Sequence, residues 1–121
     1  MQRPSLRMSL IFTITLLIQF GVFASDSITG NWKHSNKPAV ISINLKSGIA
    51  SIKTHKLHKG AEGLTLIKNI SQHASLHQEW VGNMFNGYVG IFEPVTIRLV
   101  KAKEIAVYNI KNEEVLRLLR E

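Results

Sequence analysis

The sequence predicts an all-β domain: a small antiparallel up-and-down β-barrel of about eight short strands, preceded by an N-terminal signal peptide. Apolar and polar side chains alternate along much of the chain, as in Ile41, Ile43 and Leu45, which is typical of strands with one face in a core. Turn-forming residues recur at a spacing of about 8–12 residues. A single open sheet of this length would leave two bare edges, and closure into a barrel removes them.

The first half of the predicted barrel begins with a hairpin. Residues 40–45 alternate apolar and polar side chains, and Lys46-Ser47-Gly48 predicts a turn in which Gly48 takes a positive φ. Residues 49–54 then return as the second arm, with Ala50 and Ile52 on one face. The polar stretch 55–62 predicts a loop, residues 63–67 a short strand, and residues 69–78 a loop or one helical turn.

The second half continues the same up-and-down pattern. Residues 79–85 predict a strand with Trp80, Gly82 and Met84 on one face, and Asn86-Gly87 is the strongest hairpin signal of the chain. Further strands are expected at residues 88–92, 95–99 and 105–110, with turns at 101–104 and 111–113. Residues 113–120 contain good helix formers, but the steady spacing of the preceding strands favours a closing strand at 115–120.

The N-terminal segment is predicted to be a signal peptide. Arg3 and Arg7 precede an apolar run at residues 8–23, and Val22-Phe23-Ala24 places small residues ahead of a cleavage site before Ser25. The run is shorter than the roughly 20 residues of a bilayer span, so cleavage is expected rather than retention as an anchor. We therefore assign residues 1–24 to the signal peptide and 25–121 to the barrel domain, and no later stretch is apolar enough to cross a membrane.

Composition narrows the compartment and the partners. The chain has no cysteine, so disulfides and a cysteine-linked lipid anchor are excluded, and a small disulfide-free exported domain suits a bacterial periplasm. Without its leader the chain has 97 residues, with 13 basic and 8 acidic side chains. The lysines are scattered singly, without the aromatic-interleaved basic stripe that single-stranded nucleic acid needs. We expect a periplasmic or secreted protein that binds no nucleic acid, and the sequence specifies no oligomeric state.

A short motif near the start of the domain adds a family resemblance. Gly30-Asn31-Trp32, at the beginning of the first strand, resembles the Gly-x-Trp signature of lipocalins. In that family the tryptophan closes one end of the barrel and a basic residue of the last strand packs across its ring. The resemblance implies this role here for Gly30, Trp32 and either Arg117 or Arg120, of which Arg120 is the closer match.

A narrower resemblance is to a bacterial family of secreted lipocalin-like (calycin) domains of unknown function. The matching pieces are the Gly-x-Trp start, the apolar first hairpin, a short Gly-Leu strand, Trp80-Val81-Gly82 and the closing strands. This chain departs from that family in its basic loop at residues 55–62 and in lacking a final Trp-x-Arg. The resemblance implies a barrel that binds a small apolar or amphipathic ligand, and Met84, Phe85 and Tyr108 are the expected cavity-lining residues.

Two other functions are compatible with the sequence. Imidazoles of His55, His58, His73 and His77 could bind a metal ion in the periplasm, although neighbouring lysines oppose a cation. Alternatively, a filled barrel could serve as a structural or interaction module of the cell envelope, with its basic face against an acidic partner or the membrane surface.

Catalysis has little support in the sequence. No serine lies in a Gly-x-Ser-x-Gly elbow, and the only adjacent acidic pair, Glu113-Glu114, lies in a predicted turn. The glycines belong to strands and turns rather than to a phosphate-binding loop before a helix. We expect no enzymatic activity and no cofactor.

Overall fold

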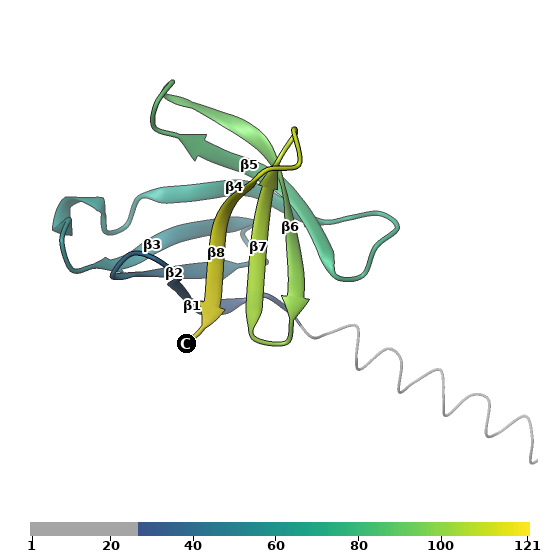
Figure 1. The fold of residues 1–121 in the computed structure, drawn as a ribbon, viewed down its shortest axis with the longest axis horizontal. Helices are drawn as coiled ribbons and strands as arrows, with labels where there is room; N and C mark the ends of the chain where they lie inside the picture. The colour runs from purple at the N-terminus through teal and green to yellow at the C-terminus, as the bar shows by residue number, and fades with distance from the viewer. Residues whose placement is uncertain (1–26) are drawn as a thin grey trace, which may run out of the picture.

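Eight β-strands follow one another along residues 27–121, the part of the chain that the computed structural model describes, and each pairs antiparallel with the next (Figure 1). The last strand pairs back onto the first through Trp32↔Arg120, Lys33↔Leu119 and His34↔Leu118. This closed eight-stranded up-and-down barrel confirms the predicted fold class and is consistent with a lipocalin-like fold. The strands are β1 (Gly30–His34), β2 (Ala39–Asn44), β3 (Ile49–His55), β4 (Thr65–Gln72), β5 (Glu79–Asn86), β6 (Ile91–Lys101), β7 (Glu104–Asn109) and β8 (Glu114–Arg120).

The predicted signal peptide, residues 1–24, lies outside the described residues. Within residues 27–121 the only helix is the 3-10 turn η1 (Lys59–Ala61), which lies in the loop predicted between β3 and β4. In this described part of the chain no helix is long and apolar enough to span a membrane.

The up-and-down order gives the barrel two different ends. The connections after β2, β4 and β6 gather at the end where β1 begins and β8 finishes, and we call this the closed end. The connections after β1, β3, β5 and β7 gather at the opposite end, which we call the open end. In Figure 1 the C-terminus lies beside the β6–β7 turn, and the β5–β6 hairpin projects away from it. The open-end connections are residues 35–38, 56–64, 87–90 and 110–113.

The hydrophobic core fills the middle and the closed half of the barrel. Alternate residues of each strand point inward, so that Trp80 of β5 faces Ile97 of β6 across the ladder and both are buried. Fully buried side chains include the large Trp32 ring. Ile28 precedes β1 and is also buried. The core comprises Ile28, Trp32, Ile41, Ile43, Ala50, Ile67, Ile70, Trp80, Val95, Ile97, Ile105, Val107, Leu116 and Leu118.

The strand predicted at residues 63–67 is shorter than the observed strand β4. The strand runs over Thr65–Gln72 and takes in residues predicted to be a loop or a helical turn. Its pairing with β5 shifts register between Lys68 and Ser71, and Asn69 has φ 57°. Because this bulge inserts one residue, Ile67 and Ile70 are both buried although they are three apart. The bulge removes the period-two pattern by which a strand is recognised.

For β6 the prediction was wrong in a different way, because the sequence predicts two short strands where the structure has one long strand. Residues 91–92 of the strand predicted at 88–92 and all of the strand predicted at 95–99 belong to one strand that continues through Pro94, whereas residues 88–90 lie in the turn before it. The ladder between β6 and β7 stops at Val95↔Asn109, so at Pro94 the strand has only β5 as a neighbour. A residue without an N–H is tolerated at such an edge position. The number of strands is still eight, as predicted, because Gly30–His34 forms a strand of its own before β2.

The predicted β5–β6 hairpin exists, but its turn is longer than a two-residue Asn-Gly turn. Residues 87–90 connect the strands, and the positive φ of 74° belongs to Gly90. Asn86 organises the turn: its carbonyl accepts the Gly90 N–H at 2.8 Å and its side-chain oxygen accepts the Tyr88 N–H at 2.9 Å. This leaves the Tyr88 side chain fully exposed at the tip of the hairpin.

Candidate functional site

The closed end of the barrel is plugged by Trp32. Its indole Nε1 donates a hydrogen bond of 2.8 Å to the Ile28 carbonyl, and its side chain is fully buried. The guanidinium carbon of Arg120 lies 4.2 Å from the centre of the ring. Arg120 also donates to the carbonyls of Thr29 (3.2 Å) and Ser27 (3.1 Å). Arg120, the last residue of β8, therefore covers the tryptophan ring and binds the segment before β1.

Gly30 makes room for this arrangement. Its φ is +136°, which side chains rarely adopt, and a Cβ built there would lie 3.2 Å from Arg120 Nη1. Of the two arginines expected to cover Trp32, the structure places Arg120 there. Arg117 instead binds Glu104 (2.6 Å) and Glu114 (2.5 Å) on the barrel exterior, and its hydrogen bonds hold the pKa of Glu114 below the ordinary value.

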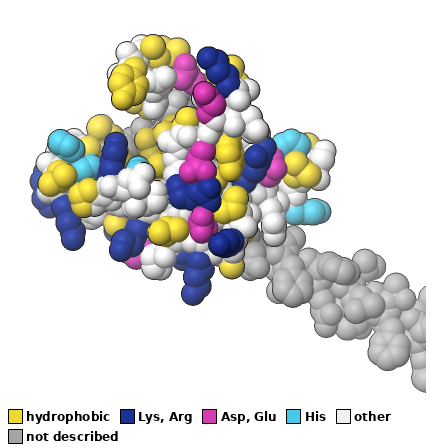
Figure 2. Space-filling model, in the orientation of Figure 1, with side chains coloured by type: hydrophobic (Ala, Val, Ile, Leu, Met, Phe, Trp, Pro, Cys, Tyr) yellow, Lys and Arg dark blue, Asp and Glu magenta, His cyan; other side chains and the backbone are white. Residues whose placement is uncertain are grey.

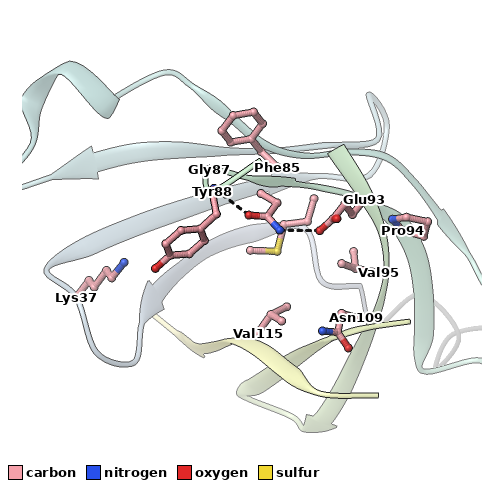
Figure 3. A pocket seen from close by; sticks show the side chains of 11 residues that line it. Lys37, Phe85, Gly87, Tyr88, Glu93, Pro94, Val95, Asn109 and Val115 are labelled. Carbon is pink, nitrogen blue, oxygen red and sulfur yellow. Dashed lines mark hydrogen bonds between the residues drawn. The ribbon is translucent and has the colours of Figure 1, made fainter. Parts of the chain in front are cut away.

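The open end contains a pocket of about 500 Å³ (Figure 3). Its walls come from β5, β6, the end of β7 and the start of β8, and its rim from the β1–β2 loop and the β5–β6 hairpin. Figure 3 shows Lys37 and Tyr88 on one side of the opening and Glu93 and Val95 toward the other. The lining residues are Lys37, Met84, Phe85, Asn86, Gly87, Tyr88, Glu93, Pro94, Val95, Asn109 and Val115.

The three residues expected to line the cavity have different positions. Met84 lines the pocket and packs against the core. Phe85 borders the pocket, but its ring points away from the opening (Figure 3) and packs edge-on against Phe92 at 5.4 Å. Tyr108 does not line it: its ring lies under the Arg98 guanidinium at 4.6 Å. Successive residues of a strand face opposite sides, so Tyr108 points outward because its neighbour Val107 is buried in the core.

The polar residues of the pocket were not among the residues expected from the sequence. Asn86 Nδ2 donates a 2.8 Å hydrogen bond to Glu93 Oε1, and Asn109 is held by the β7–β8 turn, where its Oδ1 accepts the Lys111 and Glu113 N–H groups. Glu93 is two residues from Val95 and four from Ile97, so it shares their inward phase. That spacing was visible in the sequence, but the predicted break at Pro94 concealed it.

The four histidines considered as metal ligands do not converge. His55 and His58 lie in and beside the β3–β4 loop at the open end, with ring centres 4.8 Å apart. His73 and His77 lie in the β4–β5 connection at the closed end. Figure 2 shows histidine side chains on two well-separated parts of the surface. Among residues 27–121 no three His, Asp or Glu side chains are grouped so as to hold a metal ion, so a four-histidine site is not formed.

Three histidines have a structural role instead: each ring caps the turn after its strand. Nδ1 of His34 accepts the N–H groups of Asn36 (3.0 Å) and Lys37 (3.2 Å). His55 does the same for residues 57 and 58, and His73 for residue 75. An imidazolium has no free Nδ1 lone pair. These caps therefore require the unprotonated ring, in the tautomer with its proton on Nε2.

This requirement predicts a pH effect at His34. Burial, followed by electrostatic interaction with Lys37 and then with His55, lowers the pKa of His34 below 6.5. Its contribution to stability is therefore complete above about pH 6.5 and is lost as the pH falls through the lowered pKa, because the unfolded chain binds the proton first. In His34→Asn, the Asn oxygen can cap the same turn without titrating. We expect the free energy of unfolding of the wild type, measured in urea, to fall more than that of the variant between about pH 7 and pH 5.

The control for this comparison is a measurement at about pH 8. There His34 of the wild type is neutral in both the folded and the unfolded state, so the wild type and the variant should have similar free energies of unfolding. Parallel curves of unfolding free energy against pH would contradict a role for the His34 cap in acid sensitivity.

The fold and the site together define a class of protein: a barrel filled and sealed at one end, with a partly enclosed pocket at the other. No protein-family model, curated protein or solved structure matches the chain.

Proposed function

We propose that this protein is an exported carrier or sensor that binds a small apolar or amphipathic molecule in the open-end pocket. The observation that carries the proposal is the pocket of about 500 Å³. Pockets that bind small molecules have volumes of about 300–1,000 Å³ and combine apolar walls with a few polar groups. Here Met84, Val95 and Val115 supply apolar surface, and Asn86 and Glu93 supply polar groups.

The sealed closed end supports the same proposal. Trp32, Arg120 and most of the surrounding core lie outside the pocket lining; Val95 belongs to both, and Met84 lines the pocket while packing against the core. Most of the core packing is therefore independent of the pocket, so that the pocket can stay unfilled while the fold is kept. Export to the periplasm or the medium, which we propose from the leader at residues 1–24, would place the pocket where it meets exogenous or envelope-derived small molecules.

The alternatives have weaker support. A metal-binding function through the four histidines lacks a shared site, since they lie at opposite ends of the barrel. A purely structural module with a filled barrel would leave the open-end pocket without a role.

A titration with 1-octanol, an uncharged amphipathic probe, tests the proposal. We expect saturable changes in the ¹⁵N–¹H NMR spectrum at the amides of pocket residues such as Met84, Asn86 and Val95, with the Trp32 indole signal unchanged. Absence of saturable changes with octanol and its shorter and longer homologues, or changes spread evenly over the barrel, would contradict ligand binding in this pocket.

A further inference from the structure

Glu93 is an acidic side chain on the inner face of the barrel. It pairs across the ladder with Met84, and the next inward residue of β6, Val95, is buried in the core. Glu93 is half-buried and lines the pocket, and its carboxylate accepts a hydrogen bond from Asn86 that is drawn as a dashed line in Figure 3. Acidic groups seldom take inward positions in barrels of this kind unless they are paired.

No cation of the described chain pairs with this carboxylate. The four ion pairs within residues 27–121 use Glu62, Glu79, Glu104 and Glu114. The one side-chain hydrogen bond of Glu93 in that range comes from Asn86 Nδ2 to Oε1, at 2.8 Å. This bond orients the carboxylate, and within residues 27–121 no hydrogen bond or ion pair uses its other oxygen, Oε2.

Lys37 is the one basic residue of the lining, and its place differs from that of Glu93. It belongs to the β1–β2 loop at the rim and is exposed, so its ammonium keeps its hydration. It makes none of the ion pairs found in residues 27–121. A lysine at the mouth can interact with a bound molecule at its solvent end, whereas Glu93, which is half-buried beside Met84 on the barrel wall, meets the opposite end of that molecule.

We infer that the ligand of the open-end pocket is a cationic amphiphile, such as a molecule with a protonated primary amine, and that Glu93 binds its positive group. The inference rests on the proposed function and specifies its ligand class. An ammonium at Oε2 would form a charge-assisted hydrogen bond, which is about twice as strong as a neutral one. It would also neutralise a carboxylate that the pocket walls have partly removed from water. The apolar part of the ligand would then lie over Met84 and Val115, with Tyr88 at the mouth.

Three probes with the same chain and different head groups test this: 1-octylamine, 1-octanol and octanoate, titrated into the intact domain at neutral pH and followed by NMR. We expect octylamine to bind about tenfold more tightly than octanoate, with octanol between them. In Glu93→Gln, which keeps the shape and the partner Asn86, octylamine affinity should fall about fivefold or more while octanol affinity stays within about twofold. Glu62→Gln is the matched control: this carboxylate is also half-buried at the open end but does not line the pocket, and the variant should retain the preference for octylamine.

The outcomes separate the inference from the proposed function. If none of the three probes binds, the proposed function fails. If all three bind equally, the pocket is a binding site but Glu93 does not select charge, and the inference is wrong. If octanoate binds most tightly and Lys37→Met removes that preference, the rim lysine recognises the head group and the inference is also wrong. The comparison among probes on the wild-type protein needs no variant, so it stands even if Glu93→Gln folds poorly.

Discussion

Replacing Trp32 by alanine is expected to lower the free energy of unfolding by about 3–5 kcal/mol, the range for removing a fully buried aromatic side chain. Trp32 is among the largest fully buried side chains; it belongs to the core, and the Arg120 guanidinium packs over its ring. Domains of this size are stable by only about 5–15 kcal/mol, so the variant should unfold at much lower urea concentration. Far-UV circular dichroism during urea titration measures the loss.

Tyr88→Ala is the control for this substitution. Tyr88 is also aromatic but is fully exposed, so its loss should change stability by less than about 0.5 kcal/mol. The contact between Trp32 and Arg120 predicts one more result. Arg120→Met should lower the free energy of unfolding less in a Trp32→Ala background than in the wild type, since the effects of substituting contacting residues are not additive. A Trp32→Ala effect as small as that of Tyr88→Ala would show that the closed end is not sealed by the tryptophan.

Replacing Val115 by tryptophan is expected to weaken 1-octanol binding about tenfold or more, which corresponds to about 1.4 kcal/mol. Val115 lines the pocket and is 43% exposed. A larger side chain there can extend into the pocket without displacing the buried core, so the expected change is in binding rather than in folding. The dissociation constant from an NMR titration measures it.

Val100→Trp provides the matched control. Val100 belongs to β6, is 41% exposed and does not line the pocket, so the same substitution adds the same surface at a similarly exposed strand position. Octanol affinity in this variant should stay within about twofold of the wild type. Equal losses in both variants would mean that octanol binds elsewhere or that any added tryptophan disturbs the barrel.

Most of the barrel was predictable because its strands obey simple alternation. In β2 the buried residues follow a period of two, as at Ile41 and Ile43, and in β7 the core residues Ile105 and Val107 do the same although Ala106 between them is also buried. The failures come from places where the backbone departs from that period. The bulge in β4 brings Ile67 and Ile70 to the same face, and a bulge depends on the neighbouring strand, which local sequence does not reveal.

The candidate site was predictable only in part. Met84 was placed in the pocket because it continues the phase of Trp80 and Gly82. Tyr108 was expected to line the cavity, but its phase in β7 places it outside, where its ring packs against Arg98. Glu93 was not among the expected site residues, because the sequence predicts separate strands at 88–92 and 95–99 and Glu93 lies between them, whereas β6 continues through both. Whether an inward residue lines the pocket or packs in the core depends on side chains from all eight strands.

Intermolecular nuclear Overhauser effects between bound 1-octanol and the methyl groups of the protein test the central claim most directly. The structure predicts contacts from the octyl chain to the methyls of Met84, Val95 and Val115, with none to Leu57, which is exposed at the open end but does not line the pocket. Contacts to exposed methyls such as that of Leu57 in place of those three, or no contacts at a saturating octanol concentration, would contradict ligand binding in the open-end pocket.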